Sequence, residues 1–179
     1  MRLLLPLAAA LLASCAAAPV SRTPAPPAPA PVEIAQAGTA SEAVANLASA
    51  SGSLVSGRVT LRAEAGAVRI SGEVGGLVPH GAHGLQVHEK GDCSAADASS
   101  AGQFFDPLEG VDQRGAVTGT PGRIFANDRG VAQVDVLVPG AVLGGGAAND
   151  IGGRAVLVLG ATPGAFSARV ACGTIDIIR

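Results

Sequence analysis

Two stretches in the first half of the chain alternate apolar and polar residues with a period of two. Residues 55–63 place Val55, Val59 and Leu61 on one side of the alternation, and residues 68–74 repeat the same pattern with valine and isoleucine. The turn between them contains Ala65-Gly66. Period two on both sides of a glycine-containing turn predicts a β-hairpin.

Further short apolar stretches continue this pattern along the chain. Residues 130–137 alternate again, and residues 154–159 form a continuous apolar run of the kind expected for a buried strand. Shorter strands are predicted at 84–88 and 169–178, whereas 106–121 has no strong period and is predicted to be a loop. About eight short strands predict an all-β fold, an eight-stranded antiparallel Greek-key β-sandwich or barrel.

Residues 43–50 are ambiguous in this pattern. They contain enough alanine for a helix, but a Ser51-Gly52-Ser53 turn follows at once. Both a short helix and a strand remain open for this stretch at the level of sequence.

The N-terminal residues indicate export. Arg2 precedes an apolar run at 3–12 that is too short to span a bilayer permanently, and Leu12-Ala13-Ser14-Cys15 follows. Small residues before a cysteine resemble a bacterial lipobox, which predicts a signal peptide over 1–15, cut before Cys15, and a lipid on that thiol. The alternative is an ordinary secretory signal that is cut at a later alanine.

The next segment, 16–38, is rich in proline and alanine and is predicted to be an extended tether. It would hold a β domain over 39–179 away from a membrane of the bacterial envelope, facing the periplasm or the exterior. If Cys15 carries lipid, Cys93 and Cys172 remain as a pair in an oxidising compartment, which predicts a disulfide. The formal net charge of −2 gives no basic excess, so nucleic acid is not an expected partner.

All three histidines of the chain lie close together, at His80, His83 and His88. Alternate residues of a strand share a face, so Gln86 and His88 are predicted to point the same way and His83 the other way. His83 stands beside glycines, where an imidazole more often bonds to backbone than to a metal. His80 follows a Val-Pro turn and is predicted to be exposed.

Four motifs now point to a family. Residues 83–93 read H-G-L-Q-V-H-E-K-G-D-C and 100–107 read S-A-G-Q-F-F-D-P. They resemble the H-G-F-H-V-H-E-x-G-D-C and S-A-G-x-H-F-N-P motifs of copper/zinc superoxide dismutases. Residues 150–159 resemble D-x-x-G-R-x-x-x-x-H, and 168–175 resemble the closing A-R-x-A-C-G-x-I. The resemblance extends over about residues 43–179, with motif order and spacing kept.

The resemblance implies a role for each residue that matches the family's motifs. Cys93 and Cys172 match the family's disulfide, and His83 matches its structural histidine. His88 matches a copper ligand. Arg169 matches the arginine that guides superoxide toward the copper.

The other copper-ligand positions hold different residues here. The three remaining copper histidines fall at Gln86, Phe104 and Leu159, and Phe104 stands at the position that bridges copper and zinc. The rest of the zinc ligands would come from about 109–120, yet no histidine follows His88. A stable transition-metal site needs three or four converging nitrogen or sulfur donors. We therefore expect no bound cofactor, with Phe104 and Leu159 packing into the volume of the missing centre.

Changes elsewhere agree with a remodelled site. The segment 160–168 is much shorter than the family's charged channel loop and contains no Lys, Asp or Glu, so the electrostatic steering of a small anion is expected to be lost. Arg169 is then a vestigial or structural residue, a member of an ion pair, or a site for another anion.

Three functions are open from the sequence. The first is a non-catalytic superoxide dismutase-like lipoprotein that serves as a binding or structural module of the envelope. The second is a dismutase or copper-binding protein with a remodelled single-metal site around His88. The third is a partner-docking domain, like that of a copper chaperone for superoxide dismutase, with a protein partner or a second copy as its target.

Overall fold

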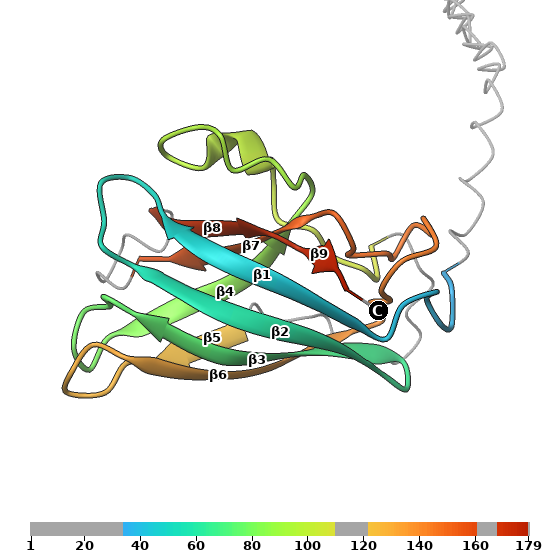
Figure 1. Cartoon of the computed structure of the whole chain (residues 1–179), viewed down its shortest axis with the longest axis horizontal. Helices are drawn as coiled ribbons and strands as arrows, with labels where there is room; N and C mark the ends of the chain where they lie inside the picture. The colour runs from blue at the N-terminus through green and yellow to red at the C-terminus, as the bar shows by residue number, and fades with distance from the viewer. Residues whose placement is uncertain (1–33, 110–121, 161–167, 179) are drawn as a thin grey trace, which may run out of the picture. The chain divides into compact units, whose positions relative to one another are not determined.

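The computed structural model describes residues 34–109, 122–160 and 168–178. In these residues the regular structure is almost entirely β, as predicted (Figure 1). The elements are β1 (Glu42–Ser49), β2 (Ser56–Glu64), β3 (Ala67–Gly75), β4 (Ala82–His88), the 3-10 turn η1 (Ser99–Ala101), β5 (Gly122–Phe125), β6 (Ala132–Pro139), β7 (Ala155–Leu159), β8 (Arg169–Thr174) and β9 (Asp176–Ile177).

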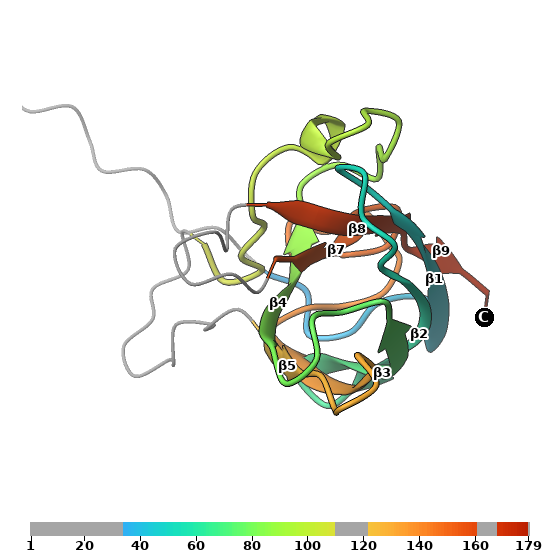
Figure 2. The ribbon, with the colours of Figure 1, turned by 90° about the vertical axis from the view of Figure 1, so that its left-hand side faces the viewer.

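Eight antiparallel strands form a nearly closed barrel in the order β5-β4-β7-β8-β1-β2-β3-β6 (Figure 2). Strand β1 connects the two halves, because its first part pairs with β2 while Ala48 and Ser49 pair with β8. The predicted hairpin is β2–β3, whose ladder runs from Ser56↔Gly75 to Glu64↔Ala67. The order also brings together strands that are not consecutive in the sequence, since β6 pairs with β3 and β7 with β4. This crossing is the predicted Greek-key arrangement.

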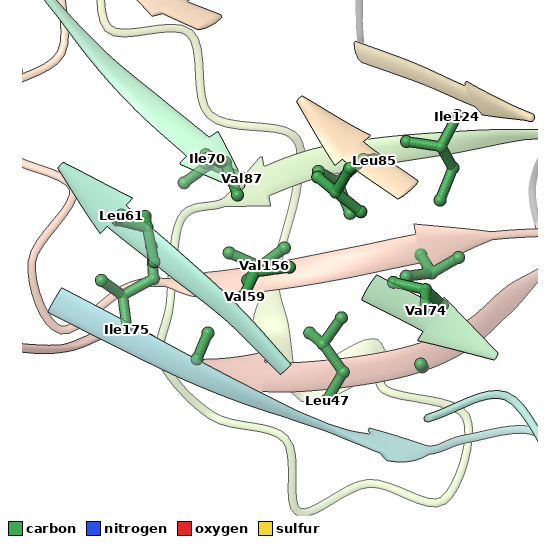
Figure 3. Packing of buried hydrophobic residues seen from close by; sticks show 14 of the residues in the cluster. Leu47, Val59, Leu61, Ile70, Val74, Leu85, Val87, Ile124, Val156 and Ile175 are labelled. Atoms are coloured by element: carbon green, nitrogen blue, oxygen red, sulfur yellow. The ribbon is translucent and has the colours of Figure 1, made fainter. Parts of the chain in front are cut away.

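Aliphatic side chains fill the interior of the barrel (Figure 3). The alternation in β2 places Val59 and Leu61 inside, fully buried, and the same phase in β3 buries Ile70. Strand β7 is buried along its whole length, in agreement with its continuous apolar sequence. The residues labelled in Figure 3 represent this core: Leu47, Val59, Leu61, Ile70, Val74, Leu85, Val87, Ile124, Val156 and Ile175.

The ambiguous segment at 43–50 forms strand β1, because it pairs with β2 and β8. Its Ala43, Ala45 and Leu47 are buried in the core, whereas Asn46 is exposed, so small side chains face the interior with a period of two. Hydrogen-bonded neighbours on both sides outweigh the helix propensity of alanine, which is a weak preference.

Two details in the C-terminal third of the chain were not predicted. Strand β5 has only four residues, Gly122–Phe125, too few for a period to be recognised. The predicted strand at 169–178 is interrupted at Ile175, whose side chain is buried in the core, and β9 then pairs with β1. The predicted loop at 106–121 falls largely outside the described residues, except for a turn at 106–109.

Residues 31–179 are a compact unit by themselves. All described strands and the hydrophobic core lie within this unit, so a chain that begins at Pro31 contains every contact reported below. At its start, Asn149, fully buried, donates to the carbonyls of Ala35 and Gly140 and accepts from the N–H of Ala35. Contact with the barrel therefore begins before the predicted domain start at residue 39. Within the described ranges there is no helix with the length and apolar character needed to cross a membrane.

Candidate functional site around His88

Strand β4 separates the side chains of the central motif onto two faces. Leu85 and Val87 point into the core, whereas Gln86 and His88 lie on the opposite face, as the alternation predicts. On that face β4 runs beside β7, with Gln86 opposite Leu157 and His88 opposite Ala155. A second, smaller apolar cluster lies there, formed by Leu157, Cys172 and several alanines.

His88 is buried and both of its ring nitrogens have partners. Nδ1 lies 3.1 Å from the carbonyl oxygen of Gly102, and Nε2 lies 3.3 Å from Oε1 of Gln86. Burial lowers the pKa of His88, which favours the neutral ring, and the positive charge of Arg169 acts in the same direction. A neutral ring with its proton on Nδ1 donates to the carbonyl oxygen of Gly102. Nε2 then carries the lone pair and faces the side-chain amide of Gln86.

The three other positions that match copper ligands have separate surroundings. Leu159 is opposite Gly84, and a Cβ built on Gly84 would lie 3.1 Å from its Cδ1, so the leucine occupies the space that the glycine leaves. Phe104 forms an isolated β-bridge with His88, but 39% of its surface is exposed. Phe104 is therefore only partly buried at this position. Its backbone bridge to His88 holds the residue beside the end of β4.

Arg169 begins β8 and is half-buried. Its guanidinium donates to the carbonyl oxygen of Ala98 at 2.6 Å and to that of Gly102 at 2.7 Å. Gly102 therefore receives hydrogen bonds from both Arg169 and His88. The salt bridges of the described chain do not include Arg169. The arginine thus fixes the loop around η1 through backbone carbonyls.

The loop that follows β4 is also covalently attached to the barrel. Cys93 and Cys172 form the predicted disulfide, with a Cα–Cα distance of 5.7 Å. Figures 1 and 2 both show this loop and η1 lying next to β8. Thr174 supports the attachment by donating from Oγ1 to the carbonyl oxygen of Gly91 at 2.7 Å.

Arg154 is a positioning residue that sequence reasoning did not single out. It donates to the carbonyl oxygens of Asp150 and Glu89 at 2.7 and 2.8 Å, and its guanidinium carbon lies 3.5 Å from the centre of the Phe105 ring. The G-R pair in the 150–159 motif marked this position but not its partners. Desolvation lowers the pKa of Arg154, whose partners are backbone oxygens and an aromatic face.

His83 lies on the core side of β4, away from His88. Its Nδ1 is 3.0 Å from the carbonyl oxygen of Leu159, and its ring is buried. Within the described part of the chain, Nε2 of His83 has no hydrogen-bond partner. His80 is exposed, in a turn with a positive φ of 57°. The three histidines therefore do not converge on one point.

The described residues around His88 do not fit a copper/zinc centre. The side chains at the four positions that match copper ligands offer one imidazole, whose two nitrogens are engaged, one amide and two hydrocarbons. Across residues 34–109, 122–160 and 168–178, no group of three or more His, Cys, Asp or Glu side chains is placed to hold a metal ion. The positions expected to match zinc ligands at 109–120 and the short segment at 160–168 fall almost wholly outside the described residues.

The fold and site define an antiparallel β-barrel with a loop that a disulfide and two arginines fix beside a buried histidine. Comparison with protein families adds one finding: the family model for copper/zinc superoxide dismutase matches residues 55–175. The match covers well over half of the chain and includes the disulfide and all the barrel strands from β2 to β8. The chain belongs to the copper/zinc superoxide dismutase family.

Proposed function

We propose that this protein is a superoxide dismutase-like lipoprotein of the bacterial envelope that has lost most of the copper and zinc ligands of its family. It serves as a non-catalytic binding or structural module. The observation that carries the proposal is the state of His88, the single retained copper-ligand position, whose nitrogens bond to Gly102 and Gln86. Dismutation needs a redox ion that takes an electron from one superoxide and gives it to another, and one engaged imidazole does not hold such an ion.

We infer that the fold of this region does not depend on a bound metal. The loop contacts of Arg169 and Arg154 and the disulfide preserve the shape of the region without using a metal. Apolar side chains in place of polar ligands are often neutral or stabilising when they pack well, as Leu159 does over Gly84.

Metal content and superoxide dismutation test this proposal together. The unit from Pro31 would be oxidised, loaded with copper and zinc, and passed through a chelating column. We expect no copper retained and no dismutation above that of the buffer. A matched variant with Gln86→His, Phe104→His and Leu159→His restores the family's imidazoles on the same backbone and shows whether the assay detects copper binding on this fold.

Stoichiometric copper in the native unit, with dismutation, would refute the proposal. The alternative of a single remodelled site around His88 would then be tested with His88→Ala, which must release the copper if that site exists. Retention of all the copper by His88→Ala would place the metal elsewhere and refute both assignments.

Anchoring through Cys15 is a separate part of the proposal. The full chain expressed in a bacterium should fractionate with membranes, and its N-terminal peptide should carry the mass of a lipid on Cys15. Cys15→Ala should move the protein to the soluble fraction of the envelope. An unmodified mature N-terminus at a later alanine would support the ordinary secretory signal instead.

A further inference from the structure

The barrel has an incomplete seam between β5 and β6. Strand β5 pairs with β4 only from Ala82↔Phe125 to Leu85↔Gly122, and among the described residues β6 pairs only with β3. A Cβ on Gly122 would lie 2.5 Å from Cγ1 of Val136, so the two strands touch through side chains where no ladder joins them. Beyond Gly122 the place of β5 beside β4 is taken by Phe105, whose N–H bonds to the carbonyl oxygen of Val87 at 2.9 Å.

An apolar cavity of about 40 Å³ opens at this point. Its floor includes Ile70, only 1% exposed, so the cavity reaches the core of the barrel. Leu85 and Val87 form the wall on the β4 side, and Val136 and Val138 form the opposite wall on β6. Such a cavity, lined by hydrocarbon, does not hold water well, because a buried water needs two to four polar partners.

Among the described residues, the charged side chain that lines the cavity is that of Asp106. Gln86 also lines it, but its side chain contacts His88 on the face of β4 opposite to Leu85 and Val87. The Oδ1 atom of Asp106 accepts a hydrogen bond from the backbone of Leu108 at 2.9 Å, which fixes the carboxylate at the rim. Sites for drug-sized molecules are larger, about 300–1,000 Å³, so this cavity takes only a small part of a ligand.

The volume and the charge limit what such a site takes. An apolar cavity of about 150 Å³ binds benzene, so this much smaller one favours the end of an unbranched alkyl chain over a ring. The carboxylate at the rim repels an anionic head group and attracts a cationic one. We propose that the cavity at this seam, between β4 and β6, binds the alkyl end of a small neutral or cationic amphiphile, with the head group at Asp106.

This site is independent of the proposed loss of metal chemistry, because metal content and alkyl binding are read out separately. The unit from Pro31, with labelled methyl groups, would be titrated in NMR with hexylamine, hexanoate and cyclohexylamine. We expect saturable shifts of the methyl groups of Leu85, Val87, Val136 and Val138 with hexylamine. Hexanoate should bind about two- to fivefold more weakly than hexylamine, because this is the change in affinity that one exposed charge pair gives. Cyclohexylamine should leave these methyl groups unshifted.

Two variants test the location. Val136→Phe fills the cavity and should abolish the shifts, whereas Val78→Phe makes the same change at an exposed position outside it and should bind like the native unit. Asp106→Asn keeps the Oδ1 acceptor and should remove the preference for the amine over hexanoate.

Several results would overturn the inference. These are unsaturable or absent shifts at the lining methyl groups, equal binding by Val136→Phe and Val78→Phe, or tight binding of cyclohexylamine. If Val136→Phe fails to fold, intermolecular NOEs from hexylamine to Leu85 and Val136 in the native unit decide the question, and their absence refutes the site.

Discussion

The disulfide between Cys93 and Cys172 should contribute a large part of the stability of this barrel. The two cysteines are 79 residues apart, and the chain-entropy relation for a loop of that length gives about 15 cal/mol/K. At 25 °C this corresponds to about 4.5 kcal/mol, the amount by which the cross-link raises the free energy of the unfolded chain. Domains of this size are commonly stable by only about 5–15 kcal/mol, so reduction should leave a marginal fold.

Reduction of the native protein is the cleanest perturbation, because it keeps both sulfur atoms in place. In the folded state, the loop keeps its hydrogen bonds from Arg154, Arg169 and Thr174 to backbone carbonyls. The cost should therefore arise mainly in the unfolded state, where the reduced chain gains freedom. Cys172, only 3% exposed, is replaced by a smaller side chain in a Cys→Ala variant, which adds a packing loss that reduction avoids.

Urea unfolding of the unit from Pro31, with and without reductant, measures the effect. With a slope of about 2 kcal/mol/M, the midpoint should fall by about 2 M on reduction. The control is Cys93→Ala/Cys172→Ala, whose midpoint should not respond to reductant. A loss below about 1.5 kcal/mol on reduction would refute the reasoning, and would mean that the reduced unfolded chain keeps structure that the entropy relation ignores.

Three further predictions follow from single residues. Arg169→Lys keeps the charge but removes the guanidinium that donates to two carbonyl oxygens. We therefore expect the free energy of unfolding in urea to fall by about 1–2 kcal/mol and amide exchange around η1 to become faster; unchanged exchange would contradict the role of these two hydrogen bonds. Asn149→Ala leaves the N–H and C=O of Ala35, which is partly buried, without this partner. It should lower the free energy of unfolding by about 2–3 kcal/mol and expose residues 34–38 to protease; equal cleavage of both forms would rule this out. Because the pKa of His88 is lowered in the folded state, the unfolded chain binds its proton more readily, and stability present above pH 6.5 should fall as the pH drops through the folded pKa. His88→Gln should flatten this part of the pH profile, and an unchanged profile would show that other groups cause it.

The alternation of apolar and polar residues was sufficient to predict most of the barrel. Strands β2, β3, β6 and β7 lie where the sequence places them, because a period of two leaves only one way to bury their apolar faces. The parity of β4 also predicted that Gln86 and His88 share a face and that His83 does not. The disulfide followed from the number of cysteines and from the family resemblance, and the structure confirms it.

Other features depend on contacts between residues far apart in the sequence. Strand β1 is a strand because β2 and β8 flank it, which its alanine-rich sequence does not reveal. The partners of Arg169 and Arg154 are backbone carbonyls, which carry no sequence signal. Phe104 stays partly exposed because its backbone bridges to His88, although its hydrocarbon character favours burial.

The sequence by itself determined most of the strands, the family and the shortage of histidines, since these depend on residue type and on local periodicity. Only the tertiary structure decided which groups His88 contacts through its ring nitrogens, how the loop with the disulfide is held, and where the barrel stays open beside β6. Hydrogen-bond partners and cavities are set by the distance between chain segments, and residues such as Arg169 and Gly102 are brought together only when the barrel closes.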